Sequence, residues 1–130
     1  MIQFPVVDSA GSVEYHIAGA ADRLNGVADR RSIAGFTHYL GVSNDGWLVS
    51  DEGLASFAVA AERSLIASIA GSPAWLADLR RVAATYPALP IIVHHLGTAR
   101  AEEGLDSPGL RNLLAAGVEP NIAVKASGFY

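Results

Sequence analysis

The sequence predicts an α/β fold in which parallel strands alternate with helices, and three observations lead to this prediction. Short apolar runs recur along the 130 residues, separated by segments of helical periodicity. The run at residues 89–97, LPIIVHHLG, is apolar without alternation, as in a strand buried on both faces. Proline, glycine and serine mark the boundaries between the runs. Alternation of this kind is typical of right-handed βαβ units and a parallel sheet.

The elements can be placed in order along one domain. We expect strands at residues 13–19, 33–40, 64–70, 89–97 and 121–130, and helices at 20–31, 52–62, 73–86 and 108–117. Ser50 or Asp51 can cap the second helix, and Ser72 with Pro73 can supply the N-cap and first residue of the third. Pro108 begins the fourth helix, after a polar loop that carries Glu102, Glu103 and Asp106.

Two architectures fit this order: an arc of a (β/α)8 barrel and an open, doubly wound sheet. The open sheet would most often carry a glycine-rich phosphate loop after its first strand. The nearest candidate, residues 70–73, has one glycine and no lysine. We therefore predict a partial (β/α)8 barrel of about five parallel strands. Since a complete barrel takes about 250 residues, residues 1–130 would form a single incomplete domain.

Composition excludes several classes of function. The net charge of −4 disfavours nucleic acid and anionic membranes as partners, because both attract clustered lysine and arginine. The chain has no cysteine, so disulfides and thiolate metal sites are excluded. No segment reads as a signal peptide or a membrane span, and we expect a cytoplasmic protein. The hydrophobic content of 51% favours a surface that meets more protein, such as a second copy in a homo-oligomer.

Two histidines, His94 and His95, end the fourth expected strand, where parallel α/β folds place their chemistry. Strand alternation puts His95 on the face of Ile91 and Val93 and His94 on the opposite face. One ring would then point into the barrel and the other toward the helix layer. We assign His95 to the barrel interior and favour His94 as a structural residue beneath the helices.

Residues 90–97, PIIVHHLG, and 120–130, PNIAVKASGFY, with a leucine-rich helix between them, resemble the amidohydrolase-related TIM-barrel hydrolases. The likeness is greatest to the lactonase branch. It implies hydrolysis of a lactone or amide-like bond in a small carboxylated or sugar-derived substrate, with water attacking a polarised carbonyl. It also implies that a divalent metal, zinc or manganese, can take part.

The resemblance assigns roles residue by residue. His95 matches the lumen-facing histidine of the family, a metal ligand or a contact of the substrate carbonyl. Lys125 matches the lysine of the strand that follows the His-Leu-Gly strand and would stabilise negative charge, and Ser127 would line the site. Thr37 stands where the family often has arginine and, with His38 and Ser68, would contact substrate.

The chain also departs from the family pattern. It lacks the His-x-His pair of the first strand and the aspartate of the last, so the expected strands would be the third to seventh of eight. The rival interpretations are a non-catalytic α/β ligand-binding or interaction module and an open-sheet nucleotide binder. His38 could equally be structural, and Lys125 could face solvent on an edge strand.

Overall fold

A computed structural model describes residues 19–127 of the chain as a parallel sheet with helices along one side. In order, the helices and strands are α1 (Ala20–Arg30), β1 (Gly35–Tyr39), α2 (Asp51–Glu62), β2 (Ile66–Ala70), α3 (Leu76–Thr85), β3 (Ile91–Val93), α4 (Pro108–Ala116) and β4 (Ile122–Val124). Short 3-10 turns lie at Trp47–Val49, Pro73–Trp75, His95–Thr98 and Ala101–Glu103. A strand is expected at residues 13–19, and residues 13–18 of it lie outside the described residues.

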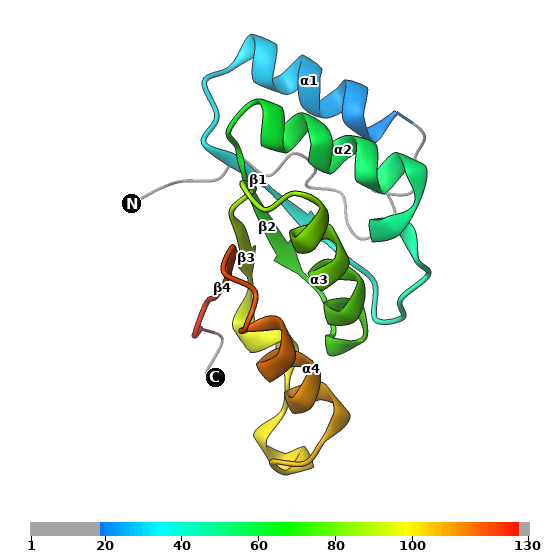
Figure 1. Cartoon of the computed structure of the whole chain (residues 1–130), viewed down its shortest axis with the longest axis vertical. Helices are drawn as coiled ribbons and strands as arrows, with labels where there is room; N and C mark the ends of the chain where they lie inside the picture. The colour runs from blue at the N-terminus through cyan, green and yellow to red at the C-terminus, as the bar shows by residue number, and fades with distance from the viewer. Residues whose placement is uncertain (1–18, 128–130) are drawn as a thin grey trace.

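The four described strands are parallel and lie in the order β1-β2-β3-β4. This order confirms the predicted arc of a (β/α)8 barrel, because a doubly wound sheet would reverse its order partway. The helices α2, α3 and α4 follow one side of the sheet, and α1 packs on α2 (Figure 1). Within residues 19–127, no helix is long and apolar enough to cross a membrane.

The register of the strands divides their side chains between two faces. Thr37, Ser68 and Ile92 are level with one another across β1, β2 and β3. The side chains directly before and after these three positions on each strand point to the helix layer. They join the core that α2 and α3 cover. This core includes Phe36, Ala67, Ile69, Ile91, Val93, Phe57, Leu79 and Val82, all at most 2% exposed.

Local chemistry explains where most elements begin. The Ser50 hydroxyl accepts a hydrogen bond from the backbone N–H of Gly53 at 3.1 Å and caps α2, as predicted. Ser107 caps α4 in the same way by accepting from Leu110, and Pro108 follows it in the first turn. At the start of β4, the Asn121 amide lies 3.0–3.1 Å from the carbonyls of Ala83, Tyr86 and Leu89, and this ties the strand to the end of α3.

The start of the third helix differs from the prediction. Residues 73–75 form a 3-10 turn, and α3 begins at Leu76. The Ser72 hydroxyl makes no capping bond and instead donates to the carbonyl of Val42 at 2.5 Å. Ser72 therefore links the loops that follow β1 and β2.

The histidine strand is shorter than predicted, and this changes the direction of its last residues. β3 ends at Val93, and the four residues from His95 to Thr98 all have φ between +50° and +61°. His94 is still extended, and its N–H donates to the carbonyl of Ile69 at 2.9 Å. Alternation therefore applies to His94, which shares the face of Ile92 away from the helices, and it does not apply to His95. The assignment of His94 to the helix layer is wrong.

Candidate functional site

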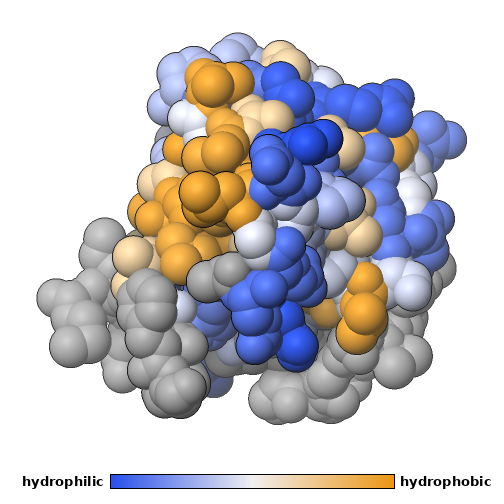
Figure 2. All heavy atoms as spheres, turned by 90° about the horizontal axis from the view of Figure 1, so that it is seen from below, coloured by the Kyte–Doolittle hydropathy of each residue, from blue (hydrophilic) through white to orange (hydrophobic). Residues whose placement is uncertain are grey.

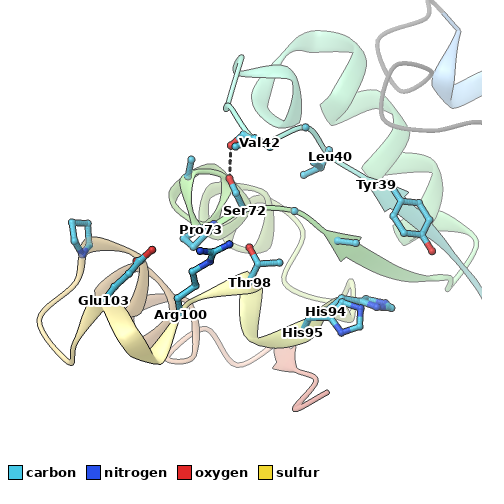
Figure 3. A pocket seen from close by; sticks show the side chains of 16 residues that line it. Tyr39, Leu40, Val42, Ser72, Pro73, His94, His95, Thr98, Arg100 and Glu103 are labelled. Atoms are coloured by element: carbon cyan, nitrogen blue, oxygen red, sulfur yellow. Dashed lines mark hydrogen bonds between the residues drawn. The ribbon is translucent and has the colours of Figure 1, made fainter. Parts of the chain in front are cut away.

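The C-terminal ends of β1, β2 and β3 border a cleft of about 770 Å³. Its walls come from the loops that follow these strands and from the start of α4, and Figure 3 shows its side chains. The ionisable residues that line it are Tyr39, His94, His95, Arg100 and Glu103. This volume suits a small organic ligand, and in parallel α/β folds the loops at this edge carry the functional residues.

His94 is held in place by the strand beside it. Its Nε2 lies within hydrogen-bond distance of the Ser68 hydroxyl, which is fully buried on β2. Burial and the positive charge of Lys125, with a smaller effect from His95, lower the pKa of His94 below its ordinary value. A neutral imidazole with one nitrogen fixed by Ser68 is therefore present at the inner end of the cleft at neutral pH.

His95 lies beside His94 but belongs to the turn that leaves the sheet. The two ring centroids are 5.5 Å apart. The Nδ1 of His95 lies 3.2 Å from the hydroxyl of Ser127, which follows β4, and the residue is exposed. The left-handed backbone at His95, with φ of +50°, turns its side chain to the cleft after β3 has ended. Both histidines thus line one cleft, as Figure 3 shows.

Lys125 and Thr37 lie on the same face of the sheet as His94. The N–H of Lys125 donates to the carbonyl of Val93 at 2.8 Å, and Val124 is the register partner of Val93, so Lys125 stands level with His94. Lys125 is exposed, whereas Thr37 is buried on β1, level with Ser68. Neither residue lines the cleft itself. Thr37, Ser68, His94 and Lys125 form a polar row across the barrel-side face.

His38 lies apart from this row. It follows Phe36 on the helix-facing side of β1, and its ring makes edge contacts with Phe36, Trp47 and Phe57 at centroid distances of 5.0–6.3 Å. The structure therefore does not bring His38 together with the other predicted site residues. Thr37, the residue directly before it on β1, points to the barrel-side face.

The metal expected from the resemblance can be compared with the donors present. A catalytic zinc usually has three protein ligands. In the part of the chain that the structure describes, no group of three or more histidine, aspartate or glutamate side chains could hold a metal. His94 and His95 supply two adjacent imidazoles, which is too few for such a centre.

Of the ionisable residues that line the cleft, sequence reasoning places only His95 in the site. His94 was assigned to the core, but the pairing of β3 with β2 would have placed it beside Ser68. Arg100 is a further cleft residue that the sequence analysis does not include among the site residues. The signal for Arg100 was its position in the loop that follows a strand ending in histidines, because such loops carry binding residues in parallel folds.

Comparisons with known proteins agree with the fold. A family model described as amidohydrolase matches residues 5–130. Among solved structures, the chain is similar to an amidohydrolase 2 from Bifidobacterium longum subsp. infantis, with 25% identity and a TM-score of 0.59 over 74% of this chain and 36% of that one. The comparison with curated proteins gives no match.

Two further solved structures share the fold. One is a probable 2-pyrone-4,6-dicarboxylic acid hydrolase from Acinetobacter baumannii with citric acid bound, at 16% identity, a TM-score of 0.68, and coverage of 92% of this chain and 43% of that one. The other is an amidohydrolase from Burkholderia multivorans with bound HEPES, at 22% identity, a TM-score of 0.66, and coverage of 88% and 42%. The chain thus spans less than half the length of each of these three proteins.

Proposed function

Because the chain belongs to the amidohydrolase family, we propose that it forms part of the active site of a hydrolase acting on a lactone or amide-like bond. The substrate would be a small carboxylated or sugar-derived molecule, and water would attack its carbonyl carbon. The observation that carries the proposal is the pair of imidazoles in one cleft at the C-terminal ends of the parallel strands. Hydrolases of this fold work at that edge.

The proposed roles follow from the positions of the side chains. His95, which is exposed in the cleft, would donate a hydrogen bond to the carbonyl oxygen and polarise it. Attack by water turns that oxygen into an oxyanion, and Lys125, which stands level with His94 on the barrel-side face beside the cleft, would stabilise the negative charge. Ser127 would orient His95 through the contact at 3.2 Å. Ser68 would orient His94 in the same way.

The proton of the attacking water needs a separate acceptor. Glu103 is the one carboxylate among the described residues that line the cleft, and it lies at the end away from the two imidazoles (Figure 3). We therefore propose that further strands of the barrel supply the base, and that this chain alone binds substrate without turning it over. A ligand-binding module without catalysis is the alternative.

Two experiments test this function. The first titrates 2-pyrone-4,6-dicarboxylate into the chain and follows the histidine resonances by NMR. We expect the His94 and His95 signals to shift, and His95→Ala to weaken binding, while Arg81→Ala, a substitution on the outer side of α3, leaves binding unchanged. A ligand that leaves both histidine signals unmoved would contradict the proposed site.

The second experiment replaces the matching segment of the Bifidobacterium longum amidohydrolase with this chain. The chimera should hydrolyse carboxylated lactones, and His95→Ala in the chimera should lower kcat/KM by at least tenfold, as expected for loss of a group that acts on the carbonyl. A folded chimera that binds the lactone without hydrolysing it would favour the ligand-binding module.

A further inference from the structure

Three residues that line the cleft stand level with one another across the sheet. Tyr39 is the register partner of Ala70. His94 follows Val93, which is the partner of Ile69, and the N–H of His94 donates to the carbonyl of Ile69 at 2.9 Å. Tyr39, Ala70 and His94 therefore form one row on the barrel-side face, and all three line the cleft. The proposed chemistry uses neither Tyr39 nor Ala70.

The row has two large side chains with a small one between them. Tyr39 and His94 carry flat rings, whereas Ala70, on the strand between them, ends at its methyl group. Figure 3 shows Tyr39 on one side of β2 and His94 on the other. Since adjacent strands lie about 4.8 Å apart, the backbones of β1 and β3 are separated by about 9–10 Å. The three residues therefore form a slot with Ala70 as its floor.

The width of this slot suits one flat ring. Carbon atoms in contact lie about 3.5–4.0 Å apart, so a ring held between two other rings needs about 7–8 Å from wall to wall. The separation of the two backbones provides this space. A puckered ring with axial substituents is thicker and would have to push the walls apart. A larger side chain in place of Ala70 would fill the same space from below.

Both walls of the slot can contact a ligand. Tyr39 is 48% exposed, so its ring can pack on a ligand without leaving the core. The imidazole of His94 is held by the hydroxyl of Ser68, which is fully buried two residues before Ala70 on β2. Flat rings that stack on aromatic side chains are stabilised beyond the area that they bury. One wall is therefore fixed in place, and the other presents an accessible aromatic face.

We infer that Ala70 determines specificity at this site, because it keeps open a slot in which Tyr39 and His94 hold one flat ring of the substrate. This inference rests on the proposed function and narrows its substrate class to molecules with a flat ring, over open-chain molecules and puckered sugar rings. A ring in the slot also lies close to His95, whose imidazole centroid is 5.5 Å from that of His94.

The test compares the binding of benzoate and cyclohexanecarboxylate to the chain by NMR. The two probes have the same charge and ring size and differ in whether the ring is flat. We expect benzoate to bind at least fivefold more tightly, and its ring protons to give nuclear Overhauser effects to the side chains of both Tyr39 and His94. Neither probe can be hydrolysed, so the result does not depend on catalysis.

Two substitutions alter the slot. Ala70→Val raises its floor with a residue that suits a strand, and it should weaken benzoate binding at least fivefold. Tyr39→Leu keeps an apolar wall but removes the flat ring, and it should abolish the preference for benzoate. Because Tyr39 is exposed, Tyr39→Leu should fold and tests the slot independently of Ala70→Val. Ala115→Val is the matched control, since Ala115 is also half-buried and lies on α4 outside the cleft.

Several outcomes would overturn the inference: no benzoate binding, equal affinity for the two probes, an unchanged affinity for benzoate in a folded Ala70→Val variant, an unchanged preference in Tyr39→Leu, or an equal loss in Ala115→Val. Benzoate binding that depends on Ala70 and Tyr39, together with an inactive chimera, would refute the proposed function and leave this inference standing. A chimera that hydrolyses lactones with flat and with puckered rings equally well would do the reverse.

Discussion

At the scale of single residues, the charge state of His94 depends on the side chains around it. Burial between β2 and β4 penalises the protonated imidazole, and Lys125, level with it on β4, adds electrostatic repulsion. A histidine whose pKa is lowered in the folded state is protonated more readily when the chain unfolds. The free energy of unfolding should therefore decrease as the pH falls below about 6.5, the ordinary pKa of histidine.

Replacement of Lys125 by methionine tests this electrostatic coupling. The substitution removes the positive charge and keeps a side chain of similar length, so the pKa of His94 should rise, and the loss of stability at acidic pH should become smaller. NMR titration of the His94 ring protons measures the change. Lys125→Arg is the control, because it keeps the charge and should leave the pKa of His94 near that of the unmodified chain. An unchanged pKa in the methionine variant would show that Lys125 does not act on His94.

The roles of the two histidines show what could be predicted residue by residue. The sequence placed His94 and His95 at the end of a buried strand, and both do line the cleft. It could not show that β3 ends at Val93, because a run of four residues with positive φ, three of them not glycine, is rare and leaves no strong signal in the chain. The alternation of side chains along a strand therefore holds as far as His94 and does not extend to His95.

At the scale of elements, the start of α2 lies in close contact with the turn that precedes it. A Cβ on Gly53 would lie 2.0 Å from the carbonyl oxygen of Trp47 and 3.0 Å from that of Leu48. Both carbonyls belong to the 3-10 turn that precedes the helix, and backbone atoms cannot swing aside as a flexible side chain can. The glycine at this position lets α2 approach the turn that follows β1.

Gly53→Ala should consequently destabilise the protein by about 2–3 kcal/mol, as expected for overpacking at a buried site. Gly26→Ala is the matched control in α1, where an added Cβ would meet only the Arg30 guanidinium at 3.4 Å. Because alanine is the better helix former, Gly26→Ala should raise stability by up to about 1 kcal/mol. Urea unfolding followed by circular dichroism compares the two variants, and equal stability of both would contradict the packing argument.

The elements themselves were largely predictable. The capping serines, the prolines and the helical spacing placed α1, α2 and α4 within a residue or two of their observed bounds. The start of α3 was misplaced because Ser72 bonds to Val42, which is distant in the sequence. Such a tertiary contact overrides a local capping signal and cannot be read from neighbouring residues.

At the scale of the whole molecule, the β4 edge of the sheet lacks a neighbouring strand among the described residues. In the described sheet β4 pairs only with β3. The side chain of Leu114 on α4 is 64% exposed, and that of Val118, in the turn between α4 and β4, is 72% exposed. Figure 2 shows apolar side chains gathered in a band on one face of the molecule. In a closed barrel the next strand and helix would cover such an edge.

We therefore expect the 130-residue chain on its own to self-associate. Size-exclusion chromatography with light scattering should give a mass of a dimer or larger, against 13.5 kDa for one chain. Leu114→Lys with Val118→Lys should shift the population toward the monomer. Val42→Lys, at a loop residue that is 85% exposed, should have little effect. A monodisperse monomer of the unmodified chain would contradict this expectation.

The sequential order of the strands also bears on how the chain folds. Each strand pairs with the next one along the chain, Gly35 with Ile66, Ala67 with Ile91 and Ile91 with Ile122, so each pairing closes a loop of about 25–30 residues. Since each described strand pairs with its neighbour in the sequence, the sheet can form by adding one βα unit at a time. During synthesis, β1 and β2 can pair soon after Ala70 leaves the ribosome, well before β4 has been translated.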